Sequence, residues 1–325
     1  MRSLRLAIAA AVIAGITACS GQPLAESPGG QDVPPAQTVV PAAPVVSATA
    51  TMTVPPSPLV GVYEGDAPSS YAGIAEFTQA TGVQPRVVLY YSGWNDPFQE
   101  KFAATAYGHG ATTFVQLEPT GPTLASIAEG DSDPYLAEFA NKVREFGHPV
   151  LLSFAHEMNG NWYSWGTGNA TPAQFIAAWR HVVQVFRSQG ADNVTWVWTV
   201  NAVNPDSAPL LEWWPGSQWV NWVGVDGYFY FPSDTFASVF GTTLTEIRTF
   251  THDPVFIGET AVGPGSETAS QVAGLFAGVK ADHVAGLVWF DQAQDDPPYH
   301  LDWHLANDPT ALAAFRAAVR RYDHA

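Results

Sequence analysis

Residues 150–166 read VLLSFAHEMNGNWYSWG, an apolar run that ends in a histidine and a glutamate. Its first part is nearly continuous in apolar side chains, which is typical of a β-strand with both faces buried. Similar runs recur along the chain. The eight predicted strands are Leu59–Tyr63, Arg86–Ser92, Thr112–Leu117, Val150–Phe154, Val194–Val200, Trp222–Val225, Val255–Gly258 and Ala285–Phe290.

Amphipathic segments separate several of these runs. Thr171 is placed to cap one of them, with Pro172 at the first helical position. Prolines 205, 209 and 215 interrupt any long helix in the fifth unit. The predicted helices include Tyr135–Phe146, Pro172–Gln189, Thr235–Phe250, Ser266–Lys280 and Pro309–Tyr322.

Strands that alternate with helices over residues 59–325 predict a single (β/α)8 barrel, an α/β fold with a parallel sheet. A doubly wound open sheet is the alternative. That fold places a glycine-rich phosphate loop after its first strand, and no such loop follows Tyr63. The sequence therefore favours the closed barrel.

The residues before Leu59 are predicted to lie outside this domain. An apolar stretch too short to span a bilayer follows Arg2 and Arg5 and ends at Cys19, the only cysteine, in a pattern that resembles a bacterial lipobox. We expect a lipoprotein signal peptide at 1–18, lipidation at Cys19, and a disordered linker rich in proline at 19–58. The protein is then a cell-surface lipoprotein; full secretion, with an ordinary signal peptide, is the alternative.

The charge of the chain restricts its partners. Asp and Glu number 30 against 13 Lys and Arg, which gives a formal net charge of -17. This charge repels phosphate backbones and acidic polysaccharides, so nucleic acid is not an expected partner and neutral ligands are favoured. We expect a monomer whose only membrane contact is a lipid anchor at Cys19.

Polar residues gather at the ends of the predicted strands. In a (β/α)8 barrel the reacting groups lie at the carboxyl ends of the strands. The residues at or just beyond the ends of the apolar runs are Glu118, His156, Glu157, Asn201, Asp226, Tyr228, Glu259, Trp289 and Asp291.

A zinc site is one interpretation of His156 and Glu157. The helical zinc motif needs a second histidine three residues after the glutamate, where this chain has Gly160. The preceding segment is also a strand rather than a helix. We therefore expect no metal, and the chemistry considered next needs no organic cofactor.

Glu157 and Glu259 each follow a different strand. Two carboxyl groups that face each other across a cleft can cleave a glycosidic bond, one as proton donor and one as nucleophile or base. A separation of about 5–5.5 Å would indicate retention of the anomeric configuration. The alternative is a buried glutamate paired to Arg or Lys, which the small number of basic residues disfavours.

Several segments of the chain resemble those of a known enzyme family. LLSFAHEMNGNWYSWG and VFIGET resemble the two catalytic segments of glycoside hydrolase family 26, a retaining (β/α)8 family typified by β-mannanases. QLEP at 116–119, FIAAWRHV at 175–182, GADNVTWVW at 190–198, WVGVDGY at 222–228 and VWFDQ at 288–292 add to the resemblance. Ser153 departs from the resemblance, because many relatives carry arginine there. The resemblance therefore does not imply how the charges of the site are balanced.

The resemblance implies roles for individual residues. Glu157 would be the acid/base and Glu259 the nucleophile, with Tyr228 donating a hydrogen bond to Glu259. His156 would lie near the bond to be cleaved. Trp289 would form the floor under the sugar and Trp162 would be a second aromatic of the cleft, since aromatic rings pack against the apolar faces of sugars. The substrate-binding residues expected are His156, Trp162, Tyr228, Trp289, Asn159 and Glu118.

The expected activity is endo-hydrolysis of a neutral β-glycan, with β-1,4-mannan first. Mixed-linkage β-1,3-1,4-glucan and β-1,3-xylan are alternatives within the same family. A carbohydrate-binding surface lipoprotein without catalysis is the alternative from another class, which the presence of both glutamates disfavours.

Overall fold

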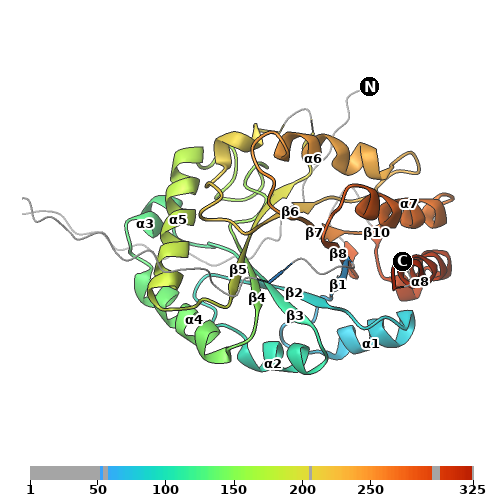
Figure 1. The fold of residues 1–325 in the computed structure, drawn as a ribbon, viewed down its shortest axis with the longest axis horizontal. Helices are drawn as coiled ribbons and strands as arrows, with labels where there is room; N and C mark the ends of the chain where they lie inside the picture. Colours follow the sequence, from blue (N-terminus) through green and yellow to red (C-terminus); the bar gives the residue numbers. More distant parts are fainter. Residues whose placement is uncertain (1–51, 54–57, 205–206, 295–300, 324–325) are drawn as a thin grey trace, which may run out of the picture.

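The structure is a computed structural model that describes residues 52–53, 58–204, 207–294 and 301–323. Eight parallel strands form a closed barrel in chain order, and the last strand pairs with the first over Leu59↔Gly286 to Tyr63↔Phe290. Figure 1 shows the helices around this barrel. The predicted (β/α)8 fold is confirmed. The strands are β1 Leu59–Tyr63, β2 Val87–Ser92, β3 Thr112–Leu117, β4 Val150–Phe154, β5 Val194–Asn201, β6 Trp222–Asp226, β7 Val255–Thr260 and β8 Gly286–Phe290.

The helices differ more from the prediction than the strands do. The Thr171 cap is present, and its side chain and that of Gln174 form a reciprocal capping box. A 3-10 turn, η1 at Leu210–Trp213, stands in the proline-interrupted fifth unit. The α-helices are α1 Ala72–Thr81, α2 Glu100–Gly108, α3 Leu124–Ala128, α4 Asp133–Phe146, α5 Pro172–Ser188, α6 Thr242–Ile247, α7 Thr268–Ala281 and α8 Pro309–Asp323.

The prediction of a single α-helix over Thr235–Phe250 is wrong. The segment forms a π-helical turn, η2 at Ala237–Gly241, which runs into the short helix α6. A π-turn inserts one extra residue per turn, so it rotates the side chains that follow. Val239 and Phe240, consecutive in sequence, are both buried here.

Two hydrophobic clusters form the core. The inner cluster fills the barrel with alternate strand residues, including Leu89, Phe114, Leu151 and Val288. The remaining apolar strand residues pack against the helices in a larger outer cluster. Because both faces of each strand are buried, the strands read as continuous apolar runs.

The amino-terminal predictions fall mostly outside the described residues. Cys19, the signal peptide at 1–18 and most of the 19–58 linker lie there. Within the linker, the amide of Met52 donates to the Thr195 hydroxyl at 2.9 Å, and its side chain packs against the inner cluster. In the described part of the chain, no helix has the length and apolar character that a bilayer crossing needs. A two-stranded ribbon of β9 Ala293–Gln294 and β10 Leu301–Asp302, and a 3-10 turn η3 at Leu305–Asn307, precede α8.

Candidate active site

Glu157 is held between two neighbouring strands just beyond the end of β4. The amide of Ala155 donates to the carbonyl of Leu117 at 3.0 Å, and the amide of Glu157 donates to the carbonyl of Thr199 at 2.9 Å. Ala155 and Glu157 adopt the left-handed backbone region, with φ of 50° and 54°. This conformation is uncommon in residues other than glycine and gathers at functional sites.

Glu259 reaches the barrel mouth through an irregularity in β7. Phe256 belongs to the inner cluster, so strict alternation would turn Glu259 toward the helices. The pairing register of β7 shifts against both neighbours, and Asp226 pairs with Glu259. A β-bulge of this kind re-aims a side chain. Gly258 leaves room beside it, since a Cβ there would lie 2.5 Å from Oδ1 of Asp226.

Two phenols hold the Glu259 carboxyl group. Tyr91 donates to Oε1 at 2.5 Å and Tyr228 donates to Oε2 at 2.7 Å. Burial, together with the charge of Glu259, raises the pKa of both phenols well above their ordinary value, so they stay protonated and act as donors. The hydrogen bond expected from Tyr228 is present.

Glu157 accepts hydrogen bonds on both oxygens. Asn201 Nδ2 donates to Oε1 at 2.7 Å, and Trp162 Nε1 donates to Oε2 at 2.9 Å. Asn201 is fixed in turn by Asn159, whose amide receives the backbone N–H of Asn201 at 2.9 Å and donates to its carbonyl at 2.8 Å.

Asn159 therefore does not fit the role of a substrate-binding residue. It is 2% exposed, and both ends of its amide are bonded to the backbone of Asn201. A hydroxyl group of a sugar would have to compete with those bonds. Asn159 positions Asn201, which contacts Glu157.

Burial and mutual repulsion set the charges of the site. Burial first, and then the charge of Glu259, raises the pKa of Glu157 to about 8 and the pKa of Glu118 to about 7. Burial also raises the pKa of Glu259, and the hydrogen bonds from Tyr91 and Tyr228 lower it. The arrangement favours a neutral Glu157 and an ionised Glu259.

Among the described residues, no basic side chain forms an ion pair with these carboxyl groups. In the described ranges Lys142 pairs with Glu145, and ring nitrogens of His181 and His304 lie 2.6 Å from Asp133 and Asp302; all of these contacts are outside the site. A fourth carboxyl group, Asp226, is completely buried beside Glu259, and its burial raises its pKa well above the ordinary value. Neutral donors and protonation, rather than Arg or Lys, therefore limit the charge of the site.

The aromatic loop after β4 packs around His156. His156 is 1% exposed, its Nε2 lies 3.2 Å from the Tyr163 hydroxyl, and its burial lowers its pKa to about 3, so it is neutral. Trp165 Nε1 donates to the carbonyl of His156 at 2.8 Å, and its ring stacks on Tyr163 at 4.3 Å. Trp165 is thus a packing residue, and Tyr163 links His156 to the loop.

Trp289 is not the floor of the site. Its side chain is completely buried in the outer cluster, between the barrel and the helices. Its ring lies 5.5 Å from that of Phe315 on α8, and its Nε1 donates to the carbonyl of Trp303 at 3.0 Å. The next residue, Phe290, is the aromatic that faces Tyr63 and Tyr228, with ring centroids at 4.7 and 5.7 Å.

Tyr91 is a site residue that the sequence analysis does not name. Asn201 was expected at the mouth of the barrel as a strand-end residue, without a particular role, and it lies there beside Glu157. Tyr91 lies one residue before the end of β2, at an inward-facing position two after Leu89. Alternation along that strand was the signal for it.

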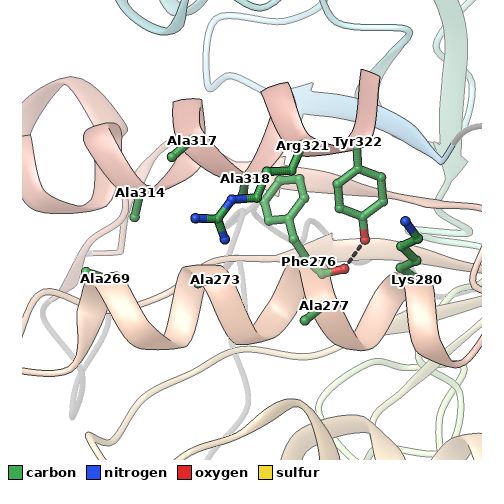
Figure 2. Close-up of a pocket in the computed structure, with 10 residues that line it drawn as sticks. All are labelled: Ala269, Ala273, Phe276, Ala277, Lys280, Ala314, Ala317, Ala318, Arg321 and Tyr322. Carbon is green, nitrogen blue, oxygen red and sulfur yellow. Dashed lines mark hydrogen bonds between the residues drawn. The ribbon is translucent and has the colours of Figure 1, made fainter. Parts of the chain in front are cut away.

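Neither a metal-binding group nor a cavity elsewhere in the described residues adds to this site. No group of three or more His, Cys, Asp or Glu residues is arranged there to hold a metal ion. A cavity of about 390 Å³ lies between α7 and α8 (Figure 2), and its lining is mostly alanine with Phe276, Lys280, Arg321 and Tyr322. None of the residues lining that cavity is one of the site carboxyl groups Glu118, Glu157, Asp226 and Glu259.

Comparisons of sequence relate the chain to glycoside hydrolases. The profile described as glycosyl hydrolase family 26 matches residues 128–257. Endoglucanase H of Acetivibrio thermocellus is 28% identical over 277 residues, which is 80% of this chain and 30% of that protein. The β-1,3-xylanase TXYA of a Vibrio species is 29% identical over 175 residues, or 50% of this chain and 36% of that protein. The chain thus spans about a third of the length of these two relatives.

Shorter sequence matches and similar solved structures were also found. Matches of 82 to 113 residues are to proteins called mannan endo-1,4-β-mannosidase. A solved β-mannanase of family 26 from Bacteroides ovatus superposes with a TM-score of 0.60, covering 81% of this chain and 88% of that one, at 16% identity. This structural likeness concerns the fold.

Proposed function

Because the chain belongs to glycosyl hydrolase family 26, we propose that it is a retaining endo-β-glycanase with Glu157 as acid/base and Glu259 as nucleophile. The observation that carries the proposal is the opposite environment of the two carboxyl groups. Two phenols donate to Glu259, whereas Glu157 is buried beside that charge and its pKa is raised to about 8. Retaining hydrolysis requires one neutral and one ionised carboxyl group.

In the first step, an oxygen of Glu259 attacks the anomeric carbon and forms a glycosyl ester. The bond from that carbon to the leaving oxygen breaks, and Glu157 gives its proton to this oxygen. The Tyr91 and Tyr228 hydroxyls orient the attacking carboxylate. Their hydrogen bonds to Glu259 weaken as the ester forms, because the new bond to the anomeric carbon removes the negative charge of the carboxylate.

In the second step, Glu157 is ionised and acts as a base. It takes a proton from a water molecule whose oxygen attacks the anomeric carbon, and the ester bond to Glu259 breaks. Asn201 and Trp162 donate to both oxygens of Glu157 and stabilise this ionised form. The same residue therefore needs contacts that suit both protonation states.

For the substrate we propose a neutral β-linked glycan, with β-1,4-mannan as the first candidate. The resemblance of the catalytic segments and the shorter relatives called mannan endo-1,4-β-mannosidase support mannan. A β-glucan is the second candidate, because the relative that matches over 277 residues is called an endoglucanase. The net charge of -17 disfavours acidic polymers in either case.

The test measures release of reducing ends from galactomannan, glucomannan, lichenan and β-1,3-xylan. Glu259→Ala and Glu157→Ala should each lower turnover by several orders of magnitude while binding of the polymer persists. Proton NMR of the first products should show the β-anomer. Wild-type turnover in Glu259→Ala would remove that residue from the mechanism, and α-anomeric first products would replace retention by inversion. Binding of the polymers without cleavage by the unmodified protein would favour a carbohydrate-binding protein.

We also propose that the protein is exported and carries lipid at Cys19. The support is the positive segment, the short apolar stretch and the ending Ile16-Thr17-Ala18-Cys19. Cells that make the full chain should incorporate labelled palmitate into it, and Cys19→Ala should abolish this label. Release of unlabelled protein into the medium would support full secretion.

A further inference from the structure

The indole of Trp162 rests directly on Gly160. A Cβ built on Gly160 would lie 2.0–2.3 Å from three carbons of the Trp162 ring. The backbone of Gly160 is outside the left-handed region, so a side chain there would disturb this ring contact rather than the backbone conformation. Seated in this way, the indole directs its N–H at Oε2 of Glu157, 2.9 Å away. Because residue 160 is glycine, the indole of Trp162 can pack on its backbone and reach Glu157.

The two oxygens of Glu157 are held with unequal firmness. Oε1 accepts from Asn201, which ends β5 and is tied at its backbone by both amide atoms of Asn159. Oε2 accepts from Trp162, a partly exposed residue of the loop after β4. A neutral carboxyl group carries its proton on one oxygen. Oε2 is the oxygen whose donor can withdraw without breaking the junction of two strands.

Several titratable groups face Glu157 and set its charge together with Trp162. Glu259 on β7 and Glu118 after β3 disfavour its ionised form by repulsion. Asp226 on β6 does not add to this repulsion, because burial and the charges of Glu259 and Glu157 raise its pKa well above the ordinary value and keep it protonated. Tyr163, in the same loop as Trp162, stays a neutral phenol. The hydrogen bonds of Asn201 and Trp162 act in the opposite direction and lower the pKa of Glu157.

Resting on the function proposed above, we propose that Trp162 is a positioning residue that moves with the protonation of Glu157. Docked on Gly160, it holds Oε2 while Glu157 is the ionised base. It withdraws from Oε2 when that oxygen carries the proton for the leaving group. Oε2 is therefore the oxygen that exchanges the proton with the glycosidic oxygen and with water.

Indole NMR tests this contact without any substrate. Protein labelled with 15N at its twelve tryptophans gives one indole N–H signal for each, and Trp162→Phe identifies the signal of Trp162 by its loss. That signal should titrate with a midpoint near the Glu157 pKa of about 8. The titration should disappear in Glu157→Gln. A signal that is constant from pH 6 to 10, or that still titrates in Glu157→Gln, overturns the proposal.

Gly160→Ala tests the docking site while keeping Trp162 in the chain. The new methyl group should displace the indole, weaken the titration of its signal and raise the midpoint of the alkaline limb of kcat/KM by roughly 0.5 to 1 pH unit. Gly274→Ala in α7 is the matched control, because a Cβ there meets nothing within 4 Å. In a Trp162→Ala background, Gly160→Ala should add no further change. An equal shift in that background would show that Gly160 acts by another route.

The two readouts separate this inference from the proposed function. A titrating indole signal in a protein that cleaves no glycan supports the contact between Trp162 and Glu157 and refutes the proposed glycanase activity. A constant indole signal in an active glycanase refutes the role of Trp162 and leaves Glu157 and Glu259 in place.

Discussion

Tyr91→Phe tests whether a neutral phenol, rather than a basic residue, keeps the nucleophile ionised. The substitution removes one oxygen and leaves the ring, so the packing of Tyr91 against Tyr63 should persist. The lost hydrogen bond is 2.5 Å long and reaches a buried carboxylate. Hydrogen bonds to charged groups contribute about 1.5–3 kcal/mol, which corresponds to a loss of roughly 10- to 100-fold in kcat/KM.

The direction of the pH effect follows from the same bond. Burial raises the pKa of Glu259, and the donors Tyr91 and Tyr228 lower it. Without the Tyr91 hydroxyl that pKa rises, so the ionised nucleophile is lost at a higher pH than in the unmodified protein. The acidic limb of kcat/KM should therefore move toward neutral pH. Tyr228→Phe should move it in the same direction.

The assay is kcat/KM between pH 3 and 10 on the polysaccharide that the panel identifies. Tyr90→Phe is the matched control, because Tyr90 is the preceding residue of β2, belongs to the outer cluster and accepts the Gln99 amide at 3.4 Å. If Tyr91→Phe matched Tyr90→Phe in both rate and acidic limb, the phenol would have no part in ionising Glu259.

Three other substitutions test the remaining assignments. Asn159→Ala should lower both turnover and the free energy of unfolding, the latter by about 1–3 kcal/mol in urea denaturation, because it leaves buried backbone groups of Asn201 unpaired. Trp289→Phe should destabilise the fold by a similar amount, about 1–3 kcal/mol, through a smaller ring and a lost hydrogen bond, with KM unchanged; a tenfold higher KM would return Trp289 to the cleft. Glu64 is buried beside Asp291, and its pKa is raised to about 9 by burial first and then by that neighbour. The folded protein thus keeps a proton that the unfolded chain releases, so Tm should fall as the pH rises from about 5 to 9. Glu64→Gln should reduce this fall, and an unchanged slope would contradict the assignment.

Sequence reasoning located the strands because burial on both faces leaves a simple pattern. Each of the eight apolar runs is a strand, with ends within two residues of the prediction. The helices were less predictable, since tertiary contacts decide whether a segment such as 235–250 forms one helix or a π-turn and a short helix. The strand-end rule then placed Glu157 and Glu259 at the same end of the barrel.

By itself, the sequence determined the closed barrel and the residue types at its mouth. The direction of each side chain was decided by the tertiary structure. Glu259 faces the site because β7 shifts its register against both neighbours, and no composition or spacing records such a shift. Trp289 faces α8 because it lies next to the inward-facing Val288 on a regular strand. The hydrogen bonds from Tyr91 to Glu259 and from Asn201 to Glu157 join residues on or just beyond different strands, so they exist only once the barrel has closed.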